Sequence, residues 1–283
     1  MRKEFENALV KGGVPVEMAA KLSLLLAPGV LLTSVPSTDE EVRVGASKFG
    51  GEPDMPEATK WPTWKGKPLA FLAQIDLSNV RQFPWCASLP TEGLLSVFYD
   101  QDQSTWGMDP ADKGSWSVQF SDGKELARRR QPPGMEVNYS VCALQVKEVA
   151  SLPELHSDIY DRADLTPVER DVIKQIFEQA DGHGVEGARN RLFGHPSQIQ
   201  GDMALECQLV SHGINTGTPE AYASAKAKAL APGADQWRML LQIDSDENAM
   251  FEWGDLGRLF FWITEDALKR RAFDEVWMIL QCS

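Results

Sequence analysis

The sequence predicts an α+β fold made mainly of antiparallel sheets in two pseudo-repeated halves, with an N-terminal helical hairpin and inserted helices. Several strand-like segments follow one another with too few residues between them for a helical crossover, which favours antiparallel pairing. The motif Leu-x-Gln-Ile-Asp occurs twice, at residues 72–76 and 240–244, which indicates an internal repeat. A chain of 283 residues with 43% hydrophobic residues is long enough to bury a full core.

The N-terminal part is predicted to begin with two helices and to continue as strands. Phe5, Ala8 and Leu9 form an apolar stripe, and Pro15 follows Gly12-Gly13 as the first residue of a second helix, so residues 3–27 read as a helical hairpin. The apolar and alternating segments that follow predict strands at residues 30–35, 41–47, 68–76, 93–100, 116–122 and 136–149.

The C-terminal part alternates helices and strands. Thr166, Pro167 and Glu169 form a capping box that predicts a helix over residues 166–180. Thr218-Pro219 starts a second, Ala-rich helix that runs to Leu230. We further predict a short helix at residues 264–273 and strands at residues 236–244, 257–263 and 275–282.

These elements are expected to form one compact domain with four parts. The parts are a hairpin (1–29), a first β-rich half (30–150), connecting helices (151–189) and a second half (190–283). In each half a Phe-Gly turn ending in Pro precedes the Gln-Ile-Asp strand, and a glycine opens an aromatic-rich strand after it. This order predicts half-domains related by an approximate two-fold, the alternative being convergent strand composition.

Polar side chains in the repeated strand are the first site candidates. Gln74 and Asp76 share one strand face, as do Gln242 and Asp244, because residues two apart point the same way. One interpretation is that each glutamine binds the adjacent turn, since a buried amide without partners costs about 1–3 kcal/mol. The other is that the two strand ends face a common cleft, where paired carboxylates share a proton.

The segment "DSDENAMFEWGD" (244–255) begins like a calcium loop but departs from its pattern. Ala249 stands where the loop needs glycine, and Asp255 replaces the bidentate glutamate, so we predict no metal site. The first choice for a ligand site is instead Asp246, Trp253, Gly254 and Asp255. Tryptophan offers a flat apolar surface, glycine permits close approach, and carboxylates bind polar or cationic groups.

His195 lies in the second Phe-Gly turn, opposite Gly51 of the first turn. It is a candidate general base or ligand-binding group, and the alternative is a bond to local backbone. The sequence contains no nucleotide-binding, zinc or serine-hydrolase motif, so no cofactor is predicted.

Two further groups have both a structural and a functional reading. Trp61, Trp64, Trp85 and Trp106 suit core packing, or an aromatic cleft for a sugar, peptide or base. The basic segment at residues 128–133 is expected to be a solvated loop, with a docking patch as the alternative.

Charge and composition exclude several classes of function. The net charge of −13 argues against binding nucleic acid or an anionic membrane, and it favours a basic protein partner. The scattered cysteines, the absence of a signal-peptide pattern and the lack of a membrane-spanning run predict a cytoplasmic protein.

Four segments together resemble the YwqG-like family of bacterial proteins. They are "KFGGEPDMPEATKWPTWKGKPLAFLAQIDL", "GHPSQIQGDM", "LLQIDSDENAMFEWGDLGRLFFWITEDAL" and "FDEVWMILQC", and they extend from Lys48 to Cys282. The resemblance implies a cytoplasmic protein without an assigned reaction, with an immunity protein of a toxin system as a special case. We therefore expect a ligand- or protein-binding module; the alternative is a hydrolase that uses carboxylates between the halves.

Overall fold

The computed structural model describes residues 2–179 and 188–283, and a ten-stranded antiparallel sheet dominates it. Its strands span Ala27–Pro36 (β1), Lys48–Phe49 (β2), Ala70–Asp76 (β6), Leu94–Tyr99 (β7), Trp116–Ser121 (β8), Cys142–Ser151 (β10), Arg191–Phe193 (β11), Trp237–Asp244 (β12), Arg258–Thr264 (β13) and Trp277–Gln281 (β14). Their spatial order is β14-β13-β12-β11-β1-β10-β2-β6-β7-β8. Two small sheets pair Asp54–Pro56 (β3) with Leu126–Arg128 (β9), and Thr63–Trp64 (β4) with Lys67–Pro68 (β5). The predicted α+β fold is confirmed.

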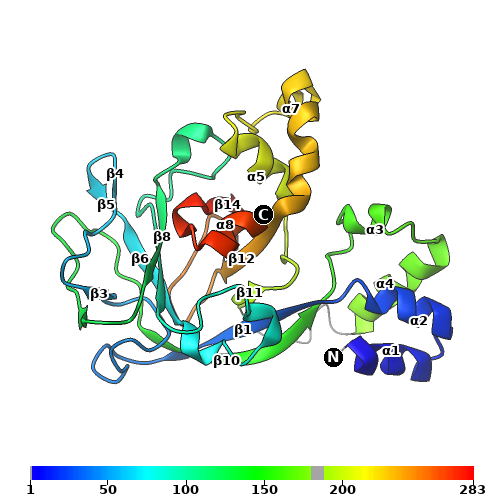
Figure 1. Ribbon diagram of the computed structural model, residues 1–283, viewed down its shortest axis with the longest axis horizontal. Coiled ribbons are helices and arrows are strands. Elements are labelled where there is room, and N and C mark those ends of the chain that lie inside the picture. The colour runs from blue at the N-terminus through cyan, green and yellow to red at the C-terminus, as the bar shows by residue number, and fades with distance from the viewer. Residues whose placement is uncertain (1, 180–187) are drawn as a thin grey trace.

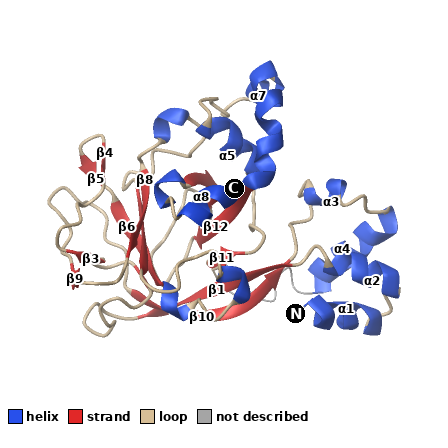
Figure 2. Cartoon of the chain, viewed as in Figure 1, coloured by secondary structure: helices blue, strands red, loops and turns tan. Residues whose placement is uncertain are grey.

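Helices gather in two places (Figures 1 and 2). Arg2–Lys11 (α1), Val16–Ser23 (α2), Ile159–Arg162 (α3) and Pro167–Gln179 (α4) form a helical cluster at one end of the long strands β1 and β10. This cluster has its own small core, which includes Leu9, Leu22, Tyr160 and Ile173. Ala204–Ser211 (α5), Pro219–Ala223 (α6), Ala225–Leu230 (α7) and Glu265–Arg270 (α8) belong to the second half. No helix in residues 2–179 or 188–283 is long and apolar enough to cross a membrane.

The capping box is present as predicted. The Thr166 backbone N–H donates to Glu169 Oε2 at 2.7 Å, and the Glu169 N–H donates to Thr166 Oγ1 at 3.3 Å. Residue 180, the expected end of this helix, lies outside the described residues.

Three expected elements differ in the structure. Residues 41–47 form turns, because Gly45 adopts a φ of +82° and the Val42 N–H bonds back to Thr38 O. The strand expected from residue 136 begins at Cys142, since the Ser140 N–H bonds to Ala249 O. The Ala-rich helix is broken at Ser224, whose hydroxyl accepts from the Ala227 N–H and caps α7.

The two halves correspond strand for strand about the central β1–β10 pair. β10 pairs with β2 and β1 pairs with β11, and the order continues outward as β6-β7-β8 on one side and β12-β13-β14 on the other. Lys48 lies opposite Gln74, and Arg191 lies opposite Gln242 in the same register. The pairing is irregular at the same point in both halves, between Phe71 and Ala73 and between Met239 and Leu241.

One continuous core joins the halves. The segment that follows β12 reaches into the first half, where the Phe251 ring contacts Phe49 and the Trp253 ring contacts Tyr99. At the outer strands, the Leu280 N–H donates to Trp106 O at 3.1 Å. The sheet is therefore curved enough for a loop between β7 and β8 to bond β14.

Candidate functional site

The two repeated glutamines share two equivalent hydrogen bonds, and Gln74 makes one more by donating to Asp54 Oδ2 at 2.6 Å. Gln74 is fully buried; it accepts from the Asp54 N–H at 2.9 Å and donates to Ala46 O at 2.7 Å. Gln242 is also fully buried; it accepts from the Ser197 N–H at 2.8 Å and donates to Arg189 O at 2.7 Å. In both halves the glutamine thus ties the two ends of the Phe-Gly turn to the strand.

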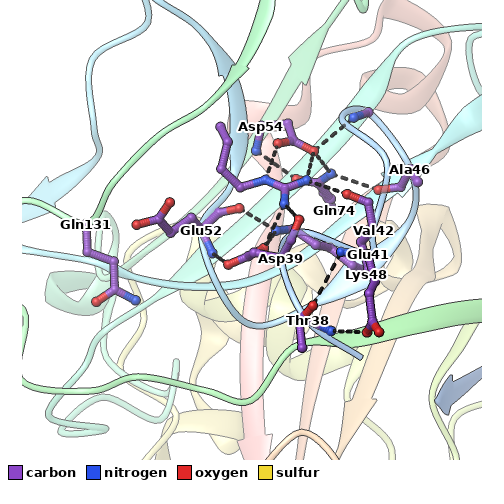
Figure 3. A network of polar contacts seen from close by, with 12 residues as sticks. Thr38, Asp39, Glu41, Val42, Ala46, Lys48, Glu52, Asp54, Gln74 and Gln131 are labelled. Atoms are coloured by element: carbon purple, nitrogen blue, oxygen red, sulfur yellow. Dashed lines mark hydrogen bonds and ion pairs between the residues drawn. The ribbon is translucent and has the colours of Figure 1, made fainter. Parts of the chain in front are cut away.

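The turn of the first half contains a balanced ionic network (Figure 3). The fully buried Lys48 forms an ion pair with Asp39, and Arg128 pairs with Asp54 at 2.8 Å. Burial alone would raise the pKa of Asp54, but hydrogen bonds from Arg128 and Gln74 outweigh it and lower that pKa. The expectation that Arg128 belongs to a solvated loop is wrong, because its side chain is only 16% exposed and its guanidinium bridges both carboxylates.

The second half places an unbalanced cation at the corresponding point. By strand register Arg191 occupies the position of Lys48, and Ser197 that of Asp54. The Arg191 guanidinium donates to Ser197 Oγ, and its Nε has no hydrogen-bond partner among the described residues. Burial lowers the pKa of Arg191 to about 10, which reflects the cost of holding this charge without a paired carboxylate.

The structure does not bring Asp76 and Asp244 together. Four strands, β2, β10, β1 and β11, lie between their strands in the sheet. Asp76 accepts from the Ser78 N–H and Oγ–H at 3.0 and 2.7 Å, so it caps the following turn. Asp244 pairs with Arg258 at 2.8 Å and accepts from the Arg189 N–H at 2.7 Å. Each carboxylate serves its own half, and the proposed proton-sharing pair is absent.

The residues predicted from the 244–255 segment form an internal turn. Asp246 accepts from Ser34 Oγ at 3.0 Å and from Asn190 Nδ2 at 2.8 Å. Trp253 is fully buried and donates to Asp244 O at 3.1 Å, so it offers no open surface. Gly254 has a φ of +61° and lies against Cys282, while Asp255 is exposed. No cluster of three or more metal-ligating side chains occurs within the described ranges.

A cleft of about 340 Å³ opens between the helical cluster and the second half. Its lining comes from the 153–162 segment and the start of β1 on one side and from the Phe193–Pro196 turn and β12 on the other. His195 lines this cleft, and its Nε2 lies 2.7 Å from Leu25 O, so the local-backbone interpretation holds for its ring. Burial lowers the pKa of His195. When the two halves are aligned by strand register, Phe193 is equivalent to Gly50. His195 is therefore equivalent to Glu52, one position from the expected Gly51.

Side chains of the cleft carry hydrogen-bond donors that have no partner among residues 2–179 and 188–283. These are Trp85 Nε1, Gln198 Nε2 and Trp262 Nε1, all buried. The Arg238 guanidinium lies over the Phe193 ring, 4.9 Å from its centre, and forms no ion pair within the described part of the chain. A buried donor without a partner costs about 1–3 kcal/mol, so three on one cavity are unusual for a purely structural surface.

The acidic side chains of the cleft, in contrast, are occupied. Asp202 accepts from Ser157 Oγ at 3.1 Å and from the Asp158 N–H at 2.6 Å. Asp235 pairs with Arg162 at 3.0 Å, and Glu154 pairs with Arg189 at 3.5 Å. The unoccupied groups of the cleft are therefore donors.

Sequence reasoning singled out Trp85 and His195 but missed Gln198, Arg238 and Trp262. Aligning the halves residue by residue would have flagged two of them. Gln198 directly follows Ser197 and so replaces the apolar Met55, and Arg238 replaces Ala70.

Comparison with known proteins identifies the family of the chain but assigns no reaction to it. No curated protein matches the chain. The family model described as a domain of unknown function, DUF1963, matches residues 47–282, which include most of the cleft and every strand of the large sheet except β1. The chain therefore belongs to the DUF1963 family.

Proposed function

We propose that this protein is a ligand-binding module whose binding site is the cleft between the helical cluster and the second half. The observation that carries the proposal is the set of three unpaired N–H groups on side chains that line one cavity. Ligand pockets of proteins combine mostly apolar walls with a few polar groups, and typically measure about 300–1,000 Å³. The cleft, with its tryptophans, Phe193 and Met239, has this composition.

The hydrolase alternative has weaker support. Asp244 and Asp246 are bound by Arg258, Ser34 and Asn190, which leaves neither carboxylate positioned as a nucleophile or base. In the cleft, the Ser157 hydroxyl donates to Asp202, and the His195 ring is bonded to a backbone carbonyl. Asp202 also accepts from the Asp158 N–H, and Ser157 Oγ accepts from the Ile159 N–H, so this pair is engaged in capping the turn before α3.

A fragment screen by ligand-observed NMR tests the proposal. Ala204 lines the cleft, and Ala204→Trp would fill it; Ala223→Trp, on the exposed surface of α6, is the matched control. We expect fragments that bind wild type and the control but not Ala204→Trp, with similar melting temperatures for all three proteins. A screen in which no fragment is displaced by the filled cleft would contradict the proposal.

We also propose, from the sequence, that this protein is a YwqG-like member of the family, that it is cytoplasmic, and that its two halves arose by an internal duplication. The matching registers and glutamine bonds of the halves support the duplication. The net charge of −13 supports a basic protein partner, of which an immunity-type complex is a special case. Association with such a partner should weaken steeply between low and high salt.

A further inference from the structure

We propose that the cleft takes a small anion that carries an aromatic or other flat apolar group, and that Arg238 binds the oxygens of this anion. This inference rests on the proposed function and names the chemical class of its ligand. Three features of the second half carry it: an open site, an excess of donors, and an unusual backbone conformation beneath Arg238.

The site is an open cleft in the second half, whereas the corresponding region of the first half is filled by side chains. In the first half Leu69, Phe71 and Phe98 pack with Met55, and Trp61 and Trp64 lie against them. By strand register these four core positions correspond to Trp237, Met239, Trp262 and Gln198, all of which line the cleft. The same architecture thus yields a solid apolar cluster on one side and a cavity on the other.

The charges and donors of the cleft select an acceptor. A neutral ligand with a carbonyl oxygen could accept a hydrogen bond from Arg238 but would leave its charge without a counter-ion, whereas a carboxylate or similar oxyanion supplies both the acceptor and the charge. Arg191 adds a second positive charge behind the Phe193–Pro196 turn, bonded to a hydroxyl and to no carboxylate among the described residues. The lining of the cleft carries three carboxylates, Glu154, Asp202 and Asp235, which are already bonded, so the groups left to bind a ligand are the cationic ones.

Phe193 provides the third argument. Its φ is +56°, a region that β-carbon-bearing residues seldom adopt, and the first half has Gly50 with a φ of +60° at that place. A bulky residue in such a conformation costs about 1 kcal/mol or more, and such outliers concentrate at functional sites. Here the ring lies under the Arg238 guanidinium and lines the cleft, so it supports the cation and offers a flat wall.

Calorimetry with three probes of one shape tests the inference on the full chain at low salt. Indole-3-acetate, indole-3-acetamide and tryptamine share a ring and differ in charge. We expect indole-3-acetate to bind about 10- to 100-fold more tightly than the amide, the range of a charge-assisted bond, and tryptamine to bind most weakly.

Variants of residues in the cleft test which side chain causes the preference for the anionic probe. Arg238→Gln should abolish the difference between acetate and amide, Arg238→Lys should keep part of it, and Phe193→Gly should weaken acetate binding. Arg270→Gln is the control, because Arg270 is an exposed arginine of α8 that does not line the cleft and is paired with Asp266 and Glu275. It should keep the wild-type order.

The possible results separate the inference from the proposed function. If the amide or the amine binds as well as the acetate, or if Arg238→Gln keeps the anion preference, the inference is wrong while ligand binding in the cleft stands. If none of the three probes binds but screened fragments do, the inference is again wrong. If nothing binds the cleft at all, both proposals fail.

Discussion

The two halves of this molecule share their strand pairings, their bulges and their glutamine bonds, yet they differ in what covers these features. The first half surrounds its buried Lys48 with carboxylates and fills its outer face with Met55, Trp61 and Trp64. The second half leaves Arg191 beside a hydroxyl and opens a cleft. The difference teaches that the sheet specifies the framework, while the segments inserted between its strands decide whether a site exists.

The largest expected loss of stability comes from removing the Asp54 carboxylate, which is present in the first half and is replaced by Ser197 in the second. Asp54→Asn should lower the free energy of unfolding by about 3–5 kcal/mol, because it leaves Arg128 buried with one partner fewer. Its second-half counterpart, Ser197→Ala, should cost less, about 1.5–3 kcal/mol, the value of one hydrogen bond to a charged group. Urea unfolding measures both, and equal losses would show that the two turns are held by the same forces.

The repeated glutamines should respond alike. Gln74→Met and Gln242→Met each leave a buried turn N–H and a carbonyl without a partner, so each should cost about 2–4 kcal/mol. Gln145→Met, at an exposed position of β10, should change stability by less than about 0.5 kcal/mol. Losses that differ between the halves by more than about 2 kcal/mol would break the equivalence.

Sensitivity to pH should belong to the second half. Glu206, on α5, has a pKa raised to about 7 by burial, with Thr216 as its hydroxyl partner. A raised pKa in the folded state means that the stabilisation is fully present below the unfolded pKa of Glu and is lost as pH rises through 7. Between pH 5 and 8, wild type should therefore lose about 2–3 kcal/mol more than Glu206→Gln.

Urea unfolding at each pH measures this difference. Glu148→Gln, at an exposed position on β10, serves as the control and should keep the wild-type pH dependence. Parallel profiles for wild type and Glu206→Gln would refute a titrating Glu206.

The smallest expected effect comes from exchanging one residue between the halves. Met55→Gln places an amide in the apolar cluster of the first half and should cost about 1–2 kcal/mol. Gln198→Met removes an unpaired donor and should be neutral or stabilising by up to about 1 kcal/mol. Thermal unfolding of both variants, with the indole-3-acetate affinity of Gln198→Met, decides whether this position trades stability for binding.

Local patterns were sufficient to predict most elements. Alternation of apolar and polar residues located the Gln-Ile-Asp strands and the aromatic strands that follow them, and Thr166 with Glu169 located α4. The structural role of the glutamines was also predictable, because a buried amide must find partners. The prediction of a strand at residues 41–47 was wrong. Val42 and Val44 alternate with polar residues as in a strand, but tertiary contacts of Asp39 and Arg128 hold that segment in turns.

The cleft was not predictable from those patterns. It is assembled from six separate segments of the chain, including the Trp85 turn and the 153–162 segment. The carboxylates that suggested catalysis were conspicuous in the sequence because they end strands. Their partners, such as Arg258 for Asp244, come from neighbouring strands whose register the sequence alone does not reveal.

The central pair of long strands also sets a direction for assembly. β1 is bonded along one edge to β10 and along the other to β11, so the strands between Ala27 and Ser151 can pair with one another before β11 is made, and Phe251 and Trp253 later complete their core. During synthesis the earlier portion emerges first and exposes the free edge of β1 as a template for the later portion. Gly29 marks the docking point, since an added β-carbon there would lie 2.9 Å from Leu192 O. A nascent chain stalled before residue 191 would thus expose an unpaired edge, the kind of surface that chaperones shield.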